Sequence, residues 1–190
     1  MRVHRSQFIN FIFILVAISL SFTPFRMFLE QSMFVQMVIQ LPILFIGGAL
    51  ISKTKPVTQF FSSIEVVNVY GLTSFMVAQV ILVYWMLPIS IDRAVVIPWV
   101  DGVKVLSMMI AGVCVGQALQ KAPLAFQLFF IGYFTAMMIW LGLYFATTEV
   151  RLCNVYSLSS QQMTGYGLLA ISGILLAWWS WRVLKDKTLF

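Results

Sequence analysis

Thioethers and carboxylates are the side chains with which this 190-residue chain could bind a metal, because imidazole is almost absent. The chain has 11 methionines but one histidine, His4, which lies in a basic amino-terminal segment. Haem b, non-haem iron and conventional copper sites depend on imidazole ligands. Methionine sulfur is a soft ligand that suits Cu(I). A copper site built from this chain alone would therefore use thioether sulfur.

Met86 is the central candidate for such a site. It lies in the stretch Tyr84 to Asp92, where a long apolar run gives way to polar residues. Glu30 and Asp101 stand at the expected outer ends of two helices, where they would form the mouth of the site. Thioethers from neighbouring helices could complete it, namely Met33, Met37, Met108 or Met109. Three thioethers would converge if the second, third and fourth helices packed together.

The same residues also have a structural interpretation that needs no metal. Methionine is a common filler of hydrophobic cores. Glu30 and Asp101 each precede an expected helix, where a carboxylate is favoured by capping and by the helix dipole. The sequence leaves both interpretations open.

Other kinds of chemistry find no support in the sequence. There is no Ser, His and acid set for acyl transfer, no Walker loop and no glycine-rich phosphate turn. We therefore expect no enzyme activity and, copper aside, no cofactor. The expected helix interiors carry amides instead of acids, which argues against a pump or carrier. A small transporter would need a water-filled cavity lined by these amides, which are Gln36, Gln40, Gln79, Gln127 and Asn68.

The composition predicts the elements that must position these residues. The chain is 61% hydrophobic and only 9% charged, which is typical of an integral membrane protein. Apolar windows long enough to cross a bilayer recur along it. They predict one all-α membrane domain over residues 1–190 with about six transmembrane helices, at 8–22, 33–51, 66–87, 102–119, 124–146 and 163–184. No small-x-small cleavage site follows the first window, so we expect that helix to be retained.

The positions of lysine and arginine predict the orientation. Cytoplasmic loops of membrane proteins carry an excess of these residues. Eight of them fall on the side of the two termini and four on the other side, so we expect both termini in the cytoplasm, in a bacterial or archaeal plasma membrane. The basic residues form no patch, which argues against nucleic-acid binding. We expect other membrane subunits and lipids as partners.

Polar residues of the expected outer loops, 88–101 and 147–160, are candidates for contact with a partner. These residues are Asp92, Arg93, Glu149 and Arg151. A polar turn between helices would hold the same residues without any partner, so this alternative stays open. On the fourth helix, Gly112 and Gly116 have the spacing that lets another helix approach closely, and we favour packing within the bundle over dimerisation.

Four motifs stand at the expected outer ends of helices, namely Glu30 to Pro42, Tyr84 to Asp92, Trp99 to Gly112 and Ser159 to Gly167. Together they resemble the motifs of the CtaG family of cytochrome c oxidase assembly proteins. In that family a His-x-x-x-His helix with a downstream proline is followed by Trp-His-x-Pro with a Tyr-Asp shortly after. A second His-x-x-x-His helix and a terminal Asp-Gln-Gln-x-x-Gly complete the pattern. The positions that match are Pro42, Trp85, Pro88, Asp92, Gly112, Gln161, Gln162 and Gly165.

The chain departs from the family pattern at every position where the pattern has histidine. Those positions hold Glu30, Phe34, Met86, Asp101 and Val105. In addition, Ile91 replaces the tyrosine before Asp92, and Ser160 replaces the acid before Gln161. The resemblance implies a small helical membrane protein linked to copper delivery, with Met86 in the place of a histidine ligand.

Two hypotheses follow from the residues and the resemblance together. In the first, the chain is a non-catalytic accessory subunit of a metal-dependent membrane redox complex, such as a terminal oxidase or a copper monooxygenase. In the second, it is a copper-assembly factor for a haem-copper oxidase that uses Met and carboxylate ligands in place of histidine.

Overall fold

The structure, a computed structural model, describes residues 32–63 and 65–185 and is helical throughout these ranges, without a strand. Its elements are η1 (Val35–Gln40), α3 (Leu41–Ile51), α4 (Lys55–Ser63), η2 (Val69–Gly71), α5 (Leu72–Met86), α6 (Pro88–Val96), α7 (Pro98–Lys121), α8 (Leu124–Thr147) and α9 (Leu158–Lys185). The all-α prediction is thus confirmed for this part of the chain.

Four helices within the described ranges are long and apolar enough to cross a membrane: Val69–Met86, Pro98–Lys121, Leu124–Thr147 and Leu158–Lys185. The segments Val35–Ile51 and Lys55–Ser63 make a fifth if this pair, bent by 79°, counts as one span. The sixth helix, expected at 8–22, lies outside the described residues. The protein is therefore an all-helical membrane protein with four or five candidate spans in its described part.

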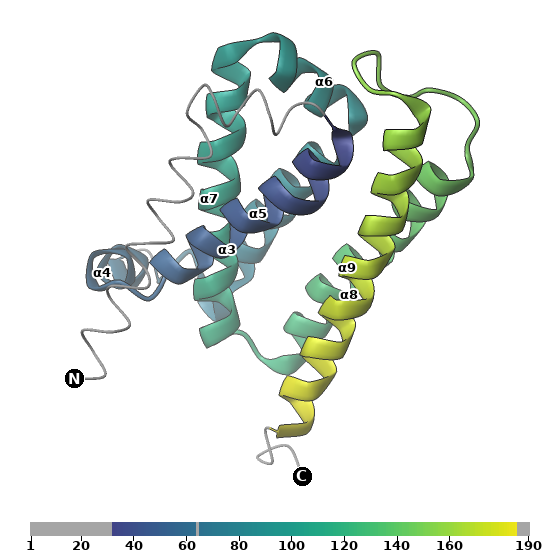
Figure 1. Cartoon of the computed structure of the whole chain (residues 1–190). Coiled ribbons are helices and arrows are strands. Elements are labelled where there is room, and N and C mark those ends of the chain that lie inside the picture. Colours follow the sequence, from purple (N-terminus) through teal and green to yellow (C-terminus); the bar gives the residue numbers. More distant parts are fainter. Residues whose placement is uncertain (1–31, 64, 186–190) are drawn as a thin grey trace, which may run out of the picture.

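Helix α7 is the centre of one packed group, in which it contacts α3 and α5 (Figure 1). Gly112 and Gly116 face α3, and a Cβ at Gly112 would overlap the carbonyl oxygen of Phe45. The expectation that these glycines serve packing within the bundle is therefore confirmed. Helices α8 and α9 form the second group, where the backbones meet at Gly142 and Gly165.

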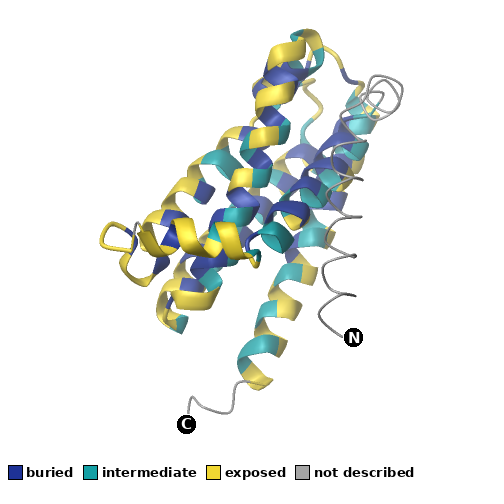
Figure 2. Cartoon of the chain, turned by 90° about the vertical axis from the view of Figure 1, so that its left-hand side faces the viewer, coloured by how far each residue is buried: buried dark blue, intermediate teal, exposed yellow. Residues whose placement is uncertain are grey.

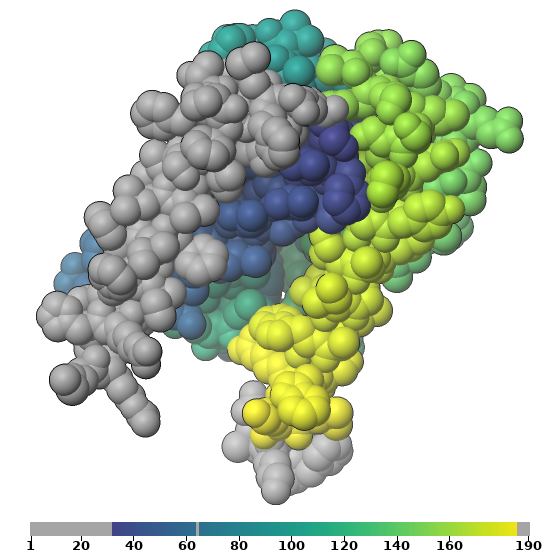
Figure 3. Space-filling view, viewed as in Figure 1, coloured from purple at the N-terminus to yellow at the C-terminus, as the bar shows by residue number. Residues whose placement is uncertain are grey.

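The two groups meet mainly at the end of the molecule that carries α6 and the loop between α8 and α9. Buried residues concentrate between the groups, and exposed ones cover the outer faces of the helices (Figure 2). In the space-filling view the last turns of α9 stand apart from the α3 side (Figure 3). There Arg182 donates a hydrogen bond of 3.1 Å to the carbonyl oxygen of Leu119 at the end of α7.

A π-helical segment, η1, precedes α3 within one continuous helix, and Pro42 explains its position. Proline has no N–H to donate to the carbonyl of Val38, and its ring crowds that carbonyl. The preceding turn is widened, so that the N–H of Leu41 bonds the carbonyl of Gln36, five residues back. Single π turns of this kind are frequent at functional sites.

Two segments expected to be loops are helical. The outer loop predicted at 88–101 is instead α6 and the first turn of α7, because Pro88 and Pro98 occupy the first turns of these helices, where proline is favoured. Residues 55–63, between two expected spans, form α4.

The third helix begins later than the expected residue 66. Tyr70 and Gly71 have φ angles of 57° and 71°. These angles lie in the left-handed region and interrupt a right-handed helix. Asn68 lies ahead of this break and not inside the helix, where its side chain bonds both the N–H and the hydroxyl of Ser74. The break therefore defines the start of α5.

Candidate metal centre

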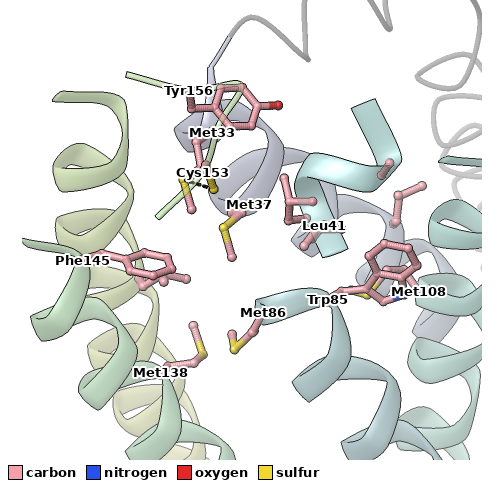
Figure 4. Packing of buried hydrophobic residues seen from close by; sticks show 14 of the residues in the cluster. Met33, Met37, Leu41, Trp85, Met86, Met108, Met138, Phe145, Cys153 and Tyr156 are labelled. Atoms are coloured by element: carbon pink, nitrogen blue, oxygen red, sulfur yellow. Dashed lines mark hydrogen bonds between the residues drawn. The ribbon is translucent and has the colours of Figure 1, made fainter. Parts of the chain in front are cut away.

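A buried cluster of sulfur atoms lies where the two groups of helices meet (Figure 4). Its members come from five places in the fold: the helical turn before η1, η1 itself, the end of α5, the middle of α8 and the loop between α8 and α9. They are Met33, Met37, Met86, Met138 and Cys153, each at most 9% exposed. Residues distant in the sequence thus bring four thioethers and one thiol into a single core.

Met37, Met86 and Met138 form the deeper part of this cluster. In Figure 4 the side chains of Met86 and Met138 point toward one another across the space between α5 and α8, and the side chain of Met37 points toward them from η1. Phe145 and Leu41 flank them. Three thioethers from three elements therefore face a common region, and thioether sulfur is a soft donor of the kind that suits Cu(I).

Cys153 and Met33 form the outer part of the cluster. The thiol of Cys153 lies 3.8 Å from the sulfur of Met33 and 3.8 Å from the carbonyl oxygen of Pro88. Burial, together with the charge of Asp92 and a hydrogen bond to it, raises the pKa of this thiol from its ordinary value of 9.0 to about 12. At neutral pH the residue is therefore a neutral thiol unless a cation displaces its proton.

Polar side chains fix the loop that carries Cys153. Asp92 on α6 accepts a 2.8 Å hydrogen bond from the N–H of Asn154. Gln161 on α9 accepts from the N–H of Leu152 and donates to the carbonyl of Val150, at 2.9 and 3.2 Å. The hydroxyl of Ser160 accepts from the N–H of Met33 at 3.0 Å. Asp92, Ser160 and Gln161 stand at positions of the CtaG-like pattern. They thus hold the backbone near Cys153 and Met33.

The carboxylates expected at the mouth of the site do not join the sulfur cluster in the described part of the chain. Glu30 lies outside the described residues. Asp101 lies in the first turn of α7, is 4% exposed and forms an ion pair of 2.6 Å with Lys104, which is fully buried. Within residues 32–63 and 65–185 no group of three or more His, Cys, Asp or Glu side chains could hold a metal. The candidate ligands that the structure brings together in this region are therefore the sulfur atoms.

Two of the expected thioethers lie elsewhere. Met108 is buried beside Trp85, away from the facing pair Met86 and Met138 (Figure 4). The backbone of Met109 contacts α3 at Gly48. The expected second and third helices do contribute thioethers, from η1 and α5, but the third contribution comes from α8, the expected fifth helix, in place of the fourth.

The four candidate partner-contact residues divide into two kinds. Asp92 and Arg151 organise the outer loop itself, since a guanidinium nitrogen of Arg151 donates to the carbonyls of Asn154 and Tyr156 at 3.1 Å each. Glu149 and Arg93 have no such role in the described part of the chain, and both are exposed, as Arg151 also is. Contact of these residues with a partner stays a prediction.

Sequence reasoning missed Met138, the burial of Cys153 and the loop-fixing hydrogen bonds of Gln161. Met138 stands in an apolar helix far from the motifs, and Cys153 falls within the expected outer loop 147–160. Gln161 was noted only as a match to the CtaG-like pattern.

Comparison of the chain with protein-family models, with curated proteins and with solved structures gives no match. The fold and composition define its class, an all-helical membrane protein. The resemblance to the CtaG family rests on the motif residues alone and stays a prediction.

Proposed function

We propose that this protein is a CtaG-like membrane assembly factor that holds Cu(I) on sulfur and passes it to a haem-copper oxidase or a related metal-dependent redox complex. The observation that carries the proposal is the gathering of Met33, Met37, Met86, Met138 and Cys153 in one core. The protein is then a carrier of copper and not an enzyme, and copper is its cargo.

The arrangement of the sulfur atoms supports a direction of transfer. Cys153 and Met33 lie next to the outer loop, and Met37, Met86 and Met138 lie deeper between the helices (Figure 4). Thioethers bind Cu(I) without losing a proton, so the ion can move among them without a change of net charge. In this proposal copper enters and leaves through the outer pair on the outer face of a bacterial or archaeal plasma membrane.

Met86 provides the sharpest test, because α5 carries a matched control. Met86 is 9% exposed in the core, whereas Met76 on the same helix is 56% exposed. Replacement of methionine by leucine keeps the volume and removes the sulfur. We expect the wild-type protein in detergent to bind about one Cu(I) per chain, and Met86→Leu to lower the affinity at least about tenfold, about 1.4 kcal/mol.

The measurement is anaerobic competition against a coloured Cu(I) chelator, with Met76→Leu as the control that should bind like the wild type. Thermal unfolding of both variants checks that the fold survives. Absence of Cu(I) binding by the wild type, or equal affinity in Met86→Leu and wild type, would contradict the proposal.

In a second candidate function, the protein is a permanent accessory subunit of such a redox complex. The outer surface of α9 favours this alternative. Beyond Ser172 this helix exposes the large apolar side chains Ile174, Trp178, Trp181 and Leu184 and stands apart from the α3 side (Figure 3). Neighbouring membrane subunits or lipids would cover this face. Mild purification distinguishes the two functions, because a subunit is recovered at a fixed ratio with its complex whereas an assembly factor is not.

A further inference from the structure

A pocket of about 210 Å³ lies at the corner where α5, α6 and α7 meet, apart from the sulfur cluster. Its walls combine aromatic rings with one cation. Tyr84 and Trp85 come from the end of α5, Arg93 from α6, and Trp99 and Val103 from the start of α7. Aromatic and basic residues together are typical of the membrane–water interface.

The aromatic wall is held in a fixed position. Trp85 is 2% exposed, and its indole N–H donates a 2.7 Å hydrogen bond to the hydroxyl of Ser107 on α7. The ring of Tyr84 packs edge-on against Trp85, with ring centroids 4.9 Å apart. The pocket therefore exists before a ligand arrives, which lowers the entropic cost of binding.

Arg93 gives the pocket its charge. The residue is exposed and forms no ion pair within the part of the chain that the structure describes. The neighbouring Asp92 accepts a hydrogen bond from the loop between α8 and α9. A guanidinium offers a planar fork of donors that matches the oxygen atoms of a phosphate. The charge of the pocket thus favours an anionic group.

Exposed apolar side chains continue from the pocket along both helices. On α5, Val80 and Val77 follow Tyr84 at helical spacing and are 68% and 43% exposed. On α7, Val103 and Leu106 continue the face of Trp99 toward the membrane interior. The cation therefore stands above two apolar stripes that an acyl chain could cover.

We propose that this pocket binds an anionic phospholipid of the outer leaflet, with the headgroup phosphate on Arg93 and an acyl chain along α5 and α7. The apolar stripes distinguish a lipid from a soluble anion, since free phosphate would use the guanidinium alone. The lipid would fasten α6 to the two spans on either side of it.

Lipid retention measures this directly. The full-length protein is reconstituted in bilayers of equal parts phosphatidylglycerol and phosphatidylcholine, extracted mildly and analysed by native mass spectrometry. We expect the wild-type protein to retain one phosphatidylglycerol in preference to phosphatidylcholine. Arg93→Gln should lower this preference about tenfold, because it removes one hydrogen bond from a charged donor. Arg93→Lys should keep part of the preference.

Two controls make the result specific. Lys55→Gln is the control for Arg93→Gln, because it removes a cation from the opposite end of the bundle. Trp140→Leu is the control for Trp99→Leu, because it removes a tryptophan on α8 that is 76% exposed. Both controls should behave like the wild type, whereas Trp99→Leu should retain less lipid. Equal retention of the two lipids by the wild type, an unchanged preference in Arg93→Gln, or displacement of the lipid by millimolar inorganic phosphate would overturn the proposal.

Discussion

At the scale of single residues, one of the positions where the CtaG-like pattern has histidine holds a sulfur-bearing side chain, Met86. Met86 was predicted as the central ligand because it follows Trp85 within the motif. Its counterpart Met138 was not predicted, because only the packing of α8 against the end of α5 brings the two side chains to face one another (Figure 4). Motif spacing thus identified one candidate ligand, and long-range packing supplied the other.

The thiol of Cys153 allows a prediction at this scale. Burial and then the charge of Asp92 raise its pKa to about 12. Because the folded-state pKa lies above the ordinary 9.0, the contribution of the thiol to stability is complete below pH 9 and lost as the pH rises toward 12. In a Cys114→Ala background, we expect alkylation of Cys153 by iodoacetamide to rise continuously from pH 8 to 11, and Asp92→Asn to move this profile to lower pH.

Asp92 also accepts the hydrogen bond of Asn154, so its replacement could expose the thiol. An opened loop would hydrate the thiol and lower its pKa as well, because burial is the larger cause of the shift. Either effect of the carboxylate changes the shape of the pH profile. A profile of unchanged shape in Asp92→Asn would therefore refute the role of the carboxylate charge.

At the scale of elements, glycine and proline decide the geometry. Pro42 produces the π turn that carries Met37, and Pro88 and Pro98 begin the two helices that replace the expected loop. Pro88 and Pro98 fell in the segment expected to be an outer loop, and the short α6 was missed because its nine residues are too few to cross a membrane. Apolar windows alone predicted the long helices well and the short ones not at all.

The contact between α3 and α7 can be tested with two glycines. A methyl group at Gly112 would overlap the carbonyl oxygen of Phe45, whereas a Cβ at Gly132 on α8 would meet nothing within 4 Å. We expect Gly112→Ala to destabilise the protein by roughly 1–3 kcal/mol, the usual cost of overpacking. Gly132→Ala should leave stability unchanged or raise it by up to about 1 kcal/mol. Thermal unfolding in detergent measures both, and equal midpoints would show that α3 moves aside freely.

At the scale of the whole molecule, the described part consists of two helix groups joined most closely at the end that carries α6. The core there contains Met33, Met37, Met86, Met138 and Cys153, and Arg182 joins α9 to the end of α7 at the other end. The sequence predicted the membrane class and four long spans because composition and window length decide both. It could not predict which helices pair, since nearly every face is apolar.

The orientation of the molecule gives the prediction for this scale. Ser159 is exposed at the start of α9, and Gln59 is exposed on α4 toward the opposite end, while both native cysteines are buried. If the α4 side faces the cytoplasm, a membrane-impermeant thiol reagent applied to intact cells should label Ser159→Cys. It should label Gln59→Cys only after the cells are permeabilised. The reverse pattern would invert the orientation and with it the proposed route of copper.

The thioether cluster has a consequence for where such a protein can work. An imidazole ligand takes up a proton near pH 6.5 and then no longer holds a metal, whereas a thioether has no proton to exchange. The outer side of an energised plasma membrane is the side toward which protons are pumped. A copper carrier built on Met37, Met86 and Met138 would still bind copper at an acidic pH at which the ligands of a histidine site are protonated.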